Sequence, residues 1–251
     1  MLRSVDPPIA AVHDQTIRGV RRIGKRIVLE FDGDLFLVLH LMIAGRLRWR
    51  APGKKPGMGP KMLLASFDFA HGRLFFTEAS SKKRASLQLV RGEEALRALD
   101  PGGVEPLDAT VDEFHGALVR ESHTLKRALT DPHLFSGIGN AYSDEILHAA
   151  RLSPMKLTRS LTDDEVVRLY GATRATLERW VDRLRAETAG GFPEKVTPST
   201  TRWRCTAASA SRARCADRRC SGSSTPRTSA TTARPARPAA ACWPTDRCRD
   251  C

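Results

Sequence analysis

The chain has 251 residues, a net charge of +13 and 41% hydrophobic residues. This length allows one or two domains. No apolar run approaches the roughly 18 residues that a membrane span requires, and the N-terminal segment lacks the apolar core of a secretory signal. We therefore expect a cytoplasmic protein with no membrane partner. The positive charge suits a nucleic-acid partner, although it is a weak indication by itself.

Residues 17–90 show the pattern of short β-strands separated by turns. In the segment Arg26–Phe31 polar and apolar residues alternate, and Asp32-Gly33 then signals a turn. Further strands are predicted over residues 35–41, 45–50, 63–69, 73–78 and 84–90, with a loop rich in Gly, Pro and Lys at 51–61. Six or seven strands with short turns favour a β-sandwich or a barrel.

From about residue 106 the hydrophobic period becomes helical. Thr110 with Glu113, and Thr162 with Glu165, are capping boxes that predict helix starts. A shorter helix is predicted at 123–129. The last helix, ended by Gly190 and Gly191, has an apolar stripe made of Val166, Leu169, Tyr170, Leu177, Val181 and Leu184.

The fold class predicted is therefore α+β, in three parts. Residues 1–105 form a partial β-sandwich, residues 106–191 form a helical domain, and residues 192–251 form a tail of different composition.

The segment SGIGNAYSDEIL, residues 136–147, places two glycines ahead of a helix. Asn140 is predicted to be the N-cap of a helix that begins at Ala141. A helix N-terminus offers free N–H groups and a positive dipole end, so it can hold a phosphate. The same residues also fit a packing corner between two helices with nothing bound, and physical reasoning alone leaves both interpretations open.

The longer segment LFSGIGNAYSDEILHAARLSP resembles the helix–two-turn–helix segment of the formamidopyrimidine-DNA glycosylase and endonuclease VIII family. RRIGKRIVLEF, LVLHLMIAGRLRW, HTLKRALTD and GGFPEKV follow in family order and spacing, so the resemblance covers residues 2–197. It implies a β-sandwich, a helical domain and a C-terminal zinc finger. It also implies a monomer that binds double-stranded DNA with a damaged base or an abasic site, excises oxidised bases and cleaves the abasic strand.

The resemblance also assigns candidate DNA-binding residues. Lys25 matches a lysine that contacts the phosphate beside the lesion and assists catalysis. His40 and Ile43 fall where the family places residues that fill the gap left by the extruded base, with Met42 as the competing wedge. Many members carry arginines that face the opposite strand at the positions of Lys82, Lys83 and Arg84, and phosphate- or lesion-side residues at the positions of Lys126 and Asn140. Without the resemblance, Lys25 would be interpreted as a solvated lysine at a strand end, and His40, Met42 and Ile43 as residues of the sheet packing. SSKKRAS differs from the commoner family form, which leaves the lesion and the opposite base open.

The N-terminus departs from the family pattern. In the family an N-terminal proline is the nucleophile, and the glutamate after it moves protons. This chain begins MLRSVDPP, and the nitrogens of Pro7 and Pro8 are tied up in peptide bonds. We therefore expect a glycosylase and lyase by family whose own polypeptide is inactive, with a non-catalytic DNA-binding remnant as the alternative. An RNA-associated protein is a further class, but the β domain argues against it.

Residues 198–251 contain eleven Arg and no Leu, Ile, Val, Met, Phe or Tyr, and all six cysteines of the chain lie there. Such a composition cannot bury a core, so we expect disorder. The irregular cysteine spacing argues against a metal site, so we expect no cofactor in this chain, although the family carries one structural zinc.

The tail also permits a second reading frame. The codon of Trp203 must be TGG, and a shift of one nucleotide around it allows A-F-H-D-E-M-A-V-H over PSTTRWRCT. The same shift further on allows two CxxC pairs at a zinc-hairpin spacing. The tail is therefore interpreted as a frameshifted zinc-finger region.

Overall fold

The computed structural model describes residues 2–4, 6–55, 57 and 59–193. Nearly all of the predicted tail, including every cysteine, lies outside these residues. The predictions of a frameshifted zinc-finger region and of disorder after residue 197 therefore concern a part of the chain that the structure does not describe.

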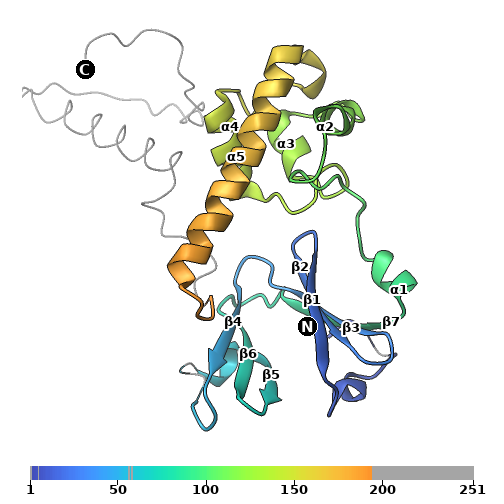
Figure 1. Cartoon of the computed structure of the whole chain (residues 1–251), viewed down its shortest axis with the longest axis vertical. Helices are drawn as coiled ribbons and strands as arrows, with labels where there is room; N and C mark the ends of the chain where they lie inside the picture. Colours follow the sequence, from blue (N-terminus) through green and yellow to red (C-terminus); the bar gives the residue numbers. More distant parts are fainter. Residues whose placement is uncertain (1, 5, 56, 58, 194–251) are drawn as a thin grey trace, which may run out of the picture. The chain divides into compact units, whose positions relative to one another are not determined.

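The described N-terminal half consists of strands in two antiparallel sheets (Figure 1). The strands are β1 (Ile17–Ile23), β2 (Arg26–Phe31), β3 (Leu35–His40), β4 (Gly45–Arg50), β5 (Leu63–Phe69), β6 (Gly72–Glu78) and β7 (Ser86–Arg91). One sheet has the order β1-β2-β3-β7 and the other the order β4-β6-β5. All of the predicted strands are confirmed, with ends displaced by at most two residues.

The two sheets enclose a common hydrophobic core. Leu37 and Leu89 of the first sheet are fully buried in the same cluster as Phe76 of the second. This packing confirms the predicted β-sandwich. The opposite face of the first sheet buries Val28 against Leu96, which belongs to the short helix α1 (Glu93–Arg97). α1 was not predicted, because its five residues are too few to show a helical period.

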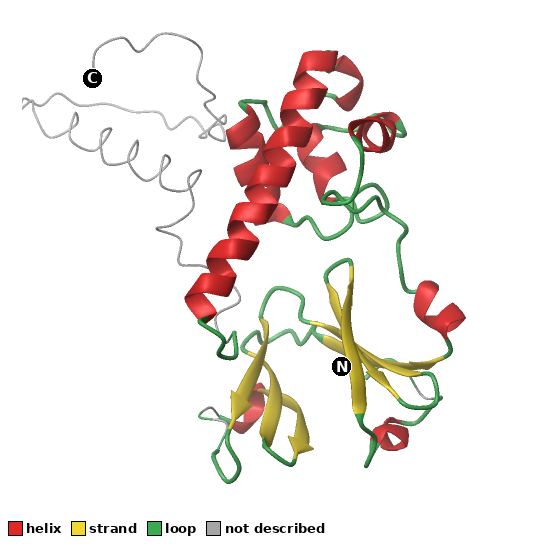
Figure 2. Ribbon diagram, in the orientation of Figure 1, coloured by secondary structure: helices red, strands yellow, loops and turns green. Residues whose placement is uncertain are grey.

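The helical part follows the strands along the chain (Figure 2). Its helices are α2 (Val111–Val119), α3 (Leu125–Thr130), α4 (Asn140–Ala150) and α5 (Asp163–Thr188). Both predicted capping boxes are present, with Thr110 and Thr162 as the N-caps of α2 and α5. α4 and α2 both pack on α5. Within the described residues, no helix is both long and apolar enough to cross a membrane.

The predicted apolar stripe of α5 is correct in its first half and wrong near its end. Val166 and Leu169 are buried, but Val181 is 37% exposed. Trp180 occupies the buried position instead, 4% exposed, with its ring edge-on to Tyr142 of α4 at 6.1 Å between centroids. Positions three and four residues after Leu177 both satisfy helical spacing, and the contact with α4 decides between them.

Two helix starts are also corrected. α3 begins at Leu125 rather than at residue 123, because Thr124 forms an antiparallel bridge with Leu157 before the helix starts. In α4, Gly139 is the N-cap and Asn140 is the first helical residue, so the prediction that Asn140 caps the helix is wrong by one position.

The turn between β3 and β4 depends on Gly45. Its N–H donates to the carbonyl oxygen of Leu41 at 2.8 Å. A Cβ at Gly45 would lie 2.2 Å from that same oxygen, closer than any side chain tolerates. The turn can therefore close only with glycine at this position.

We predict that Gly45→Ala lowers the free energy of unfolding by about 3 kcal/mol, because the turn must open to admit a methyl group. Gly116→Ala is the matched control. Gly116 lies inside α2 with no atom within 4 Å of its Cβ position, so the change should stabilise the protein by about 0.5–1 kcal/mol. Urea denaturation measures both, and equal stability of Gly45→Ala and the wild type would contradict the turn argument.

Candidate nucleic-acid interface

Lys25 lies in the tight turn that joins β1 to β2. Gly24 takes a φ of +55° there, which lets the chain reverse. The ammonium of Lys25 donates to the carbonyl oxygen of Ile138 at 2.9 Å, across 113 residues of sequence. Partial burial of this ammonium lowers the pKa of Lys25. Its positive charge therefore lies beside the segment that leads into α4.

The start of α4 has the features of an anion site. Gly137 has a φ of +80°, and a Cβ there would lie 3.0 Å from Nη1 of Arg22. Gly139 supplies no side-chain cap, and the first turn of α4 contains no acidic residue to offset the helix dipole. The first N–H groups of the helix have no partner within it, and Asn140 is exposed beside them.

His40 ends β3 and pairs with Arg26 of β2 and Ser86 of β7. Burial lowers the pKa of His40, and the positive charges of Arg26, Lys25 and Arg3 lower it further. The imidazole is therefore neutral near pH 7. It can donate or accept a hydrogen bond, but it adds no positive charge to the surface.

The turn after His40 carries two exposed apolar side chains. Ile43 is 84% exposed, more than any other large hydrophobic residue in the described part of the chain. Met42 is 41% exposed and has a φ of +53°, a conformation that is uncommon for residues other than glycine. Neither belongs to the sandwich core, so packing does not explain these side chains. The exposure favours Ile43 over Met42 as the wedge, and its role stays a prediction.

The loop between β6 and β7, residues 79–85, carries the predicted basic cluster. Lys82 and Arg84 line a pocket of about 230 Å³ together with Met42 and Ile43. Lys83 differs, because its ammonium donates to the backbone carbonyl of Glu78 at the start of the loop. The structure thus brings three predicted residues together, Ile43, Lys82 and Arg84, and gives Lys83 an internal contact.

Lys126 of α3 is paired rather than free. Its ammonium forms an ion pair with Asp144 of α4, and both side chains are a little over one third exposed. Asp144 is four residues after Asn140, so the two lie on the same face of α4. Lys126 is therefore close to the start of α4, but a phosphate would have to compete with Asp144 for its charge.

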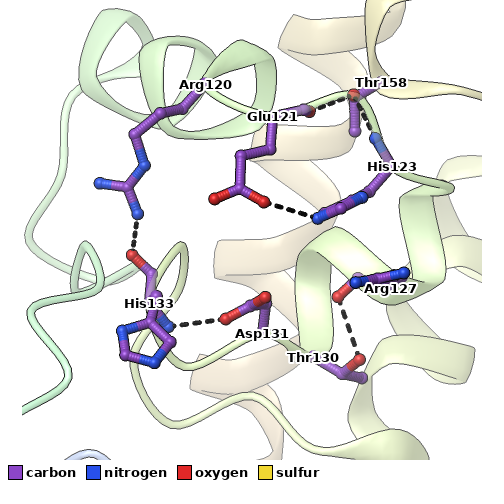
Figure 3. A network of polar contacts seen from close by, with 8 residues as sticks. All are labelled: Arg120, Glu121, His123, Arg127, Thr130, Asp131, His133 and Thr158. Atoms are coloured by element: carbon purple, nitrogen blue, oxygen red, sulfur yellow. Dashed lines mark hydrogen bonds and ion pairs between the residues drawn. The ribbon is translucent and has the colours of Figure 1, made fainter.

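A polar network fixes the segments on either side of α3 (Figure 3). The His123 ring lies 2.7 Å from the Glu121 carboxylate, and Thr158 Oγ1 donates to the Glu121 carbonyl at 3.0 Å. Arg120, which precedes α3, donates to the backbone carbonyl of His133, which follows α3. These bonds fix the position of α3, and with it that of Lys126.

The described residues contain no group of three or more His, Cys, Asp or Glu that could hold a metal ion. The six cysteines lie outside those residues. The expectation that this chain holds no metal therefore stays a prediction.

Glu78 is not among the residues predicted from the sequence. It is 2% exposed, and its carboxylate accepts hydrogen bonds from the backbone N–H groups of Arg84 and Ala85. An acidic residue at the end of a strand, followed by a run of cations, was the available signal.

The fold and the site together define a class. The chain pairs a β-sandwich with a helical domain. Cationic or exposed polar side chains lie at the start of α4 and on the loop after β6, and exposed apolar side chains lie on the loop after β3. Two domain descriptions of one family match it. "Formamidopyrimidine-DNA glycosylase N-terminal domain" matches residues 2–85, and "Formamidopyrimidine-DNA glycosylase H2TH domain" matches residues 103–189. The chain belongs to the formamidopyrimidine-DNA glycosylase family.

Its similarity to individual relatives is consistent with this family. The formamidopyrimidine-DNA glycosylase of Heliobacterium modesticaldum is 36% identical over 177 residues, which cover 68% of this chain and 63% of the relative. That of Moorella thermoacetica is 35% identical over 168 residues, covering 66% and 60%. The chain thus spans less than two thirds of the length of either relative. The boundary near residue 105 stays a prediction, since the two matched ranges leave residues 86–102 unassigned.

A solved structure supports the same fold. The Lactococcus lactis formamidopyrimidine-DNA glycosylase, non-covalently bound to DNA containing an AP site, superimposes with a TM-score of 0.60 at 26% identity. The match covers 67% of this chain and 64% of that one.

We predict that the buried charge of Lys25 has a measurable effect on the pH dependence of stability. Below the lowered pKa, Lys25 is protonated in both the folded and the unfolded protein, and burial of its charge lowers the free energy of unfolding by its full amount. Between that pKa and the ordinary lysine value of 10.5, the unfolded state binds more protons, so stability rises with pH. The stability of the wild type relative to Lys25→Met should therefore increase as the pH approaches 10.5 from below. Urea denaturation over a pH series checks this, and a constant difference would contradict it.

Proposed function

We propose that this chain binds double-stranded DNA containing a damaged base or an abasic site, as a member of a base-excision repair family of glycosylases and lyases. We further propose that the residues described here supply the DNA binding rather than the nucleophile. The observation that carries the proposal is the ammonium of Lys25, held 2.9 Å from the carbonyl of Ile138 just before α4.

In this proposal a backbone phosphate would lie between Lys25 and the start of α4. There it would accept N–H bonds from the first turn of the helix and a charge-assisted bond from Lys25. Lys25 would exchange the carbonyl of Ile138 for a phosphate oxygen, so its ammonium stays hydrogen-bonded in both states. Because the ammonium is partly buried, its attraction for the phosphate is screened less than that of a fully solvated lysine.

The loops after β3 and β6 suit a duplex with an extruded base. Ile43 offers an apolar side chain that is costly to leave in water and that can enter the base stack. Lys82 and Arg84 line the pocket next to it and can neutralise nearby phosphates. An extruded or missing base leaves the gap that such a wedge fills.

The described residues do not offer the proline nucleophile that the family reaction requires. A Schiff base requires a free amine, and the prolines near the start of the chain, Pro7 and Pro8, have amide nitrogens. The two forms of the proposal, an active lyase and a non-catalytic DNA-binding protein, therefore differ in one measurable product.

We predict that Lys25→Met weakens duplex binding and reduces the magnitude of the slope of log K against log salt by about 1, since one phosphate contact is lost. Asn140→Ala should also weaken binding but leave the slope unchanged, because the amide carries no charge. Fluorescence anisotropy over a salt series measures both variants. Wild-type affinity and slope for Lys25→Met would show that no phosphate binds there.

We also predict that borohydride treatment of the 251-residue polypeptide with duplex containing an abasic site traps no covalent adduct, under conditions where anisotropy detects the complex. An adduct migrating with the protein would establish an amine nucleophile in this chain and would favour the lyase.

A further inference from the structure

Two loops leave the second sheet from one pair of facing residues. Gly45 and Glu78 pair in the ladder between β4 and β6. The turn 41–44 enters β4 at Gly45, and the loop 79–85 leaves β6 after Glu78. The relative position of these two loops is thus set at a single point of the ladder.

Glu78 connects the two ends of the loop 79–85. Its carboxylate accepts the N–H of Arg84 at 3.0 and 3.1 Å and the N–H of Ala85 at 3.2 Å. Its backbone carbonyl accepts the ammonium of Lys83. At 2% exposed, the residue is shielded from water, so bonds from N–H groups to its carboxylate are strong and costly to lose.

The C-terminal end of the loop 79–85 is buried in the core of the sandwich. Ala85 is 1% exposed and belongs to the hydrophobic cluster of the sandwich. Lys82 and Arg84, which precede it, are exposed and line the pocket shared with Met42 and Ile43. Glu78 lines the same pocket. The carboxylate thus determines where the basic loop lies relative to the apolar turn.

We propose that Glu78 is a positioning residue that holds Lys82 and Arg84 beside Met42 and Ile43, so that the two loops contact DNA as one surface. Through this surface the protein prefers a duplex with a gap in its stack to an intact duplex. The inference rests on the proposed function and concerns a buried residue that acts through the side chains of the loop.

The direction of the effect separates positioning from simple electrostatics. A carboxylate near DNA repels phosphates, so its removal alone should strengthen binding to every duplex equally. Loss of positioning should instead weaken binding to the gapped duplex, because the cations and the wedge no longer act together. The ratio of the two affinities therefore reports positioning.

The test compares Glu78→Gln with the charge-matched control Glu94→Gln, which alters an exposed residue of α1. Each protein is titrated with a duplex containing a tetrahydrofuran abasic analogue and with the same duplex intact. For Glu78→Gln we expect the ratio of affinities to fall about tenfold, because an NH₂ group replaces one accepting oxygen and the bonds that remain to the amide oxygen are no longer charge-assisted. The ratio for Glu94→Gln should stay at the wild-type value. Hydrogen exchange at the amides of Arg84 and Ala85 should be faster in Glu78→Gln only.

An unchanged ratio, or unchanged exchange at those two amides, would overturn the positioning role. A wild type that binds both duplexes equally would also overturn it, while leaving the phosphate site at α4 intact. A wild type that binds neither duplex would remove the proposed function, and this inference with it. Should Glu78→Gln fail to fold, Glu78→Asp keeps the charge and shortens the side chain, and a fall of about threefold is expected.

Discussion

The hydrogen bond from Lys25 to Ile138 is the contact on which the proposed phosphate site depends. It ties the turn between β1 and β2 to the glycine turn ahead of α4. Arg22 reinforces the link, since it donates to Gly24 and pairs with Glu105 at 2.6 Å. Gly137 has a φ of +80°, a conformation in which any other residue would be strained. A cation and a helix N-terminus from distant parts of the sequence are thereby held together by contacts within the protein.

How much the sequence predicts depends on how local each interaction is. The capping boxes at Thr110 and Thr162 involve residues three apart, and both are found as predicted. Trp180 rather than Val181 is buried because it contacts Tyr142 of α4. The sequence of α5 alone does not reveal this contact. The role of Glu78 also needs a folded loop, because its partners become neighbours only when the loop closes. Sequence patterns thus give the elements, whereas tertiary contacts choose between positions that the patterns leave equivalent.

The candidate site shows the same division. Without the family resemblance, Lys25 would be a solvated lysine at a turn, and neither its spacing nor its neighbours predict burial. The structure gives it a partner 113 residues away and a lowered pKa. Lys83 and Lys126 show the reverse, because two expected DNA contacts are bonded within the protein, to Glu78 and Asp144. Matching residue types therefore identified the basic positions but could not show which cations are free.

In the proposed function, the residues at the start of α4 and those on the loops after β3 and β6 would have different roles in recognising DNA. A phosphate at α4 has the same chemistry beside every base, so this site can hold a duplex but cannot find a lesion. Ile43 behaves differently, because an apolar side chain exposed at 84% gains from burial only where the base stack offers a gap. The neutral imidazole of His40 at the base of that turn adds no charge that would favour intact duplex. Affinity and discrimination would then reside on different elements, so a change to the loop after β6 can alter one without the other.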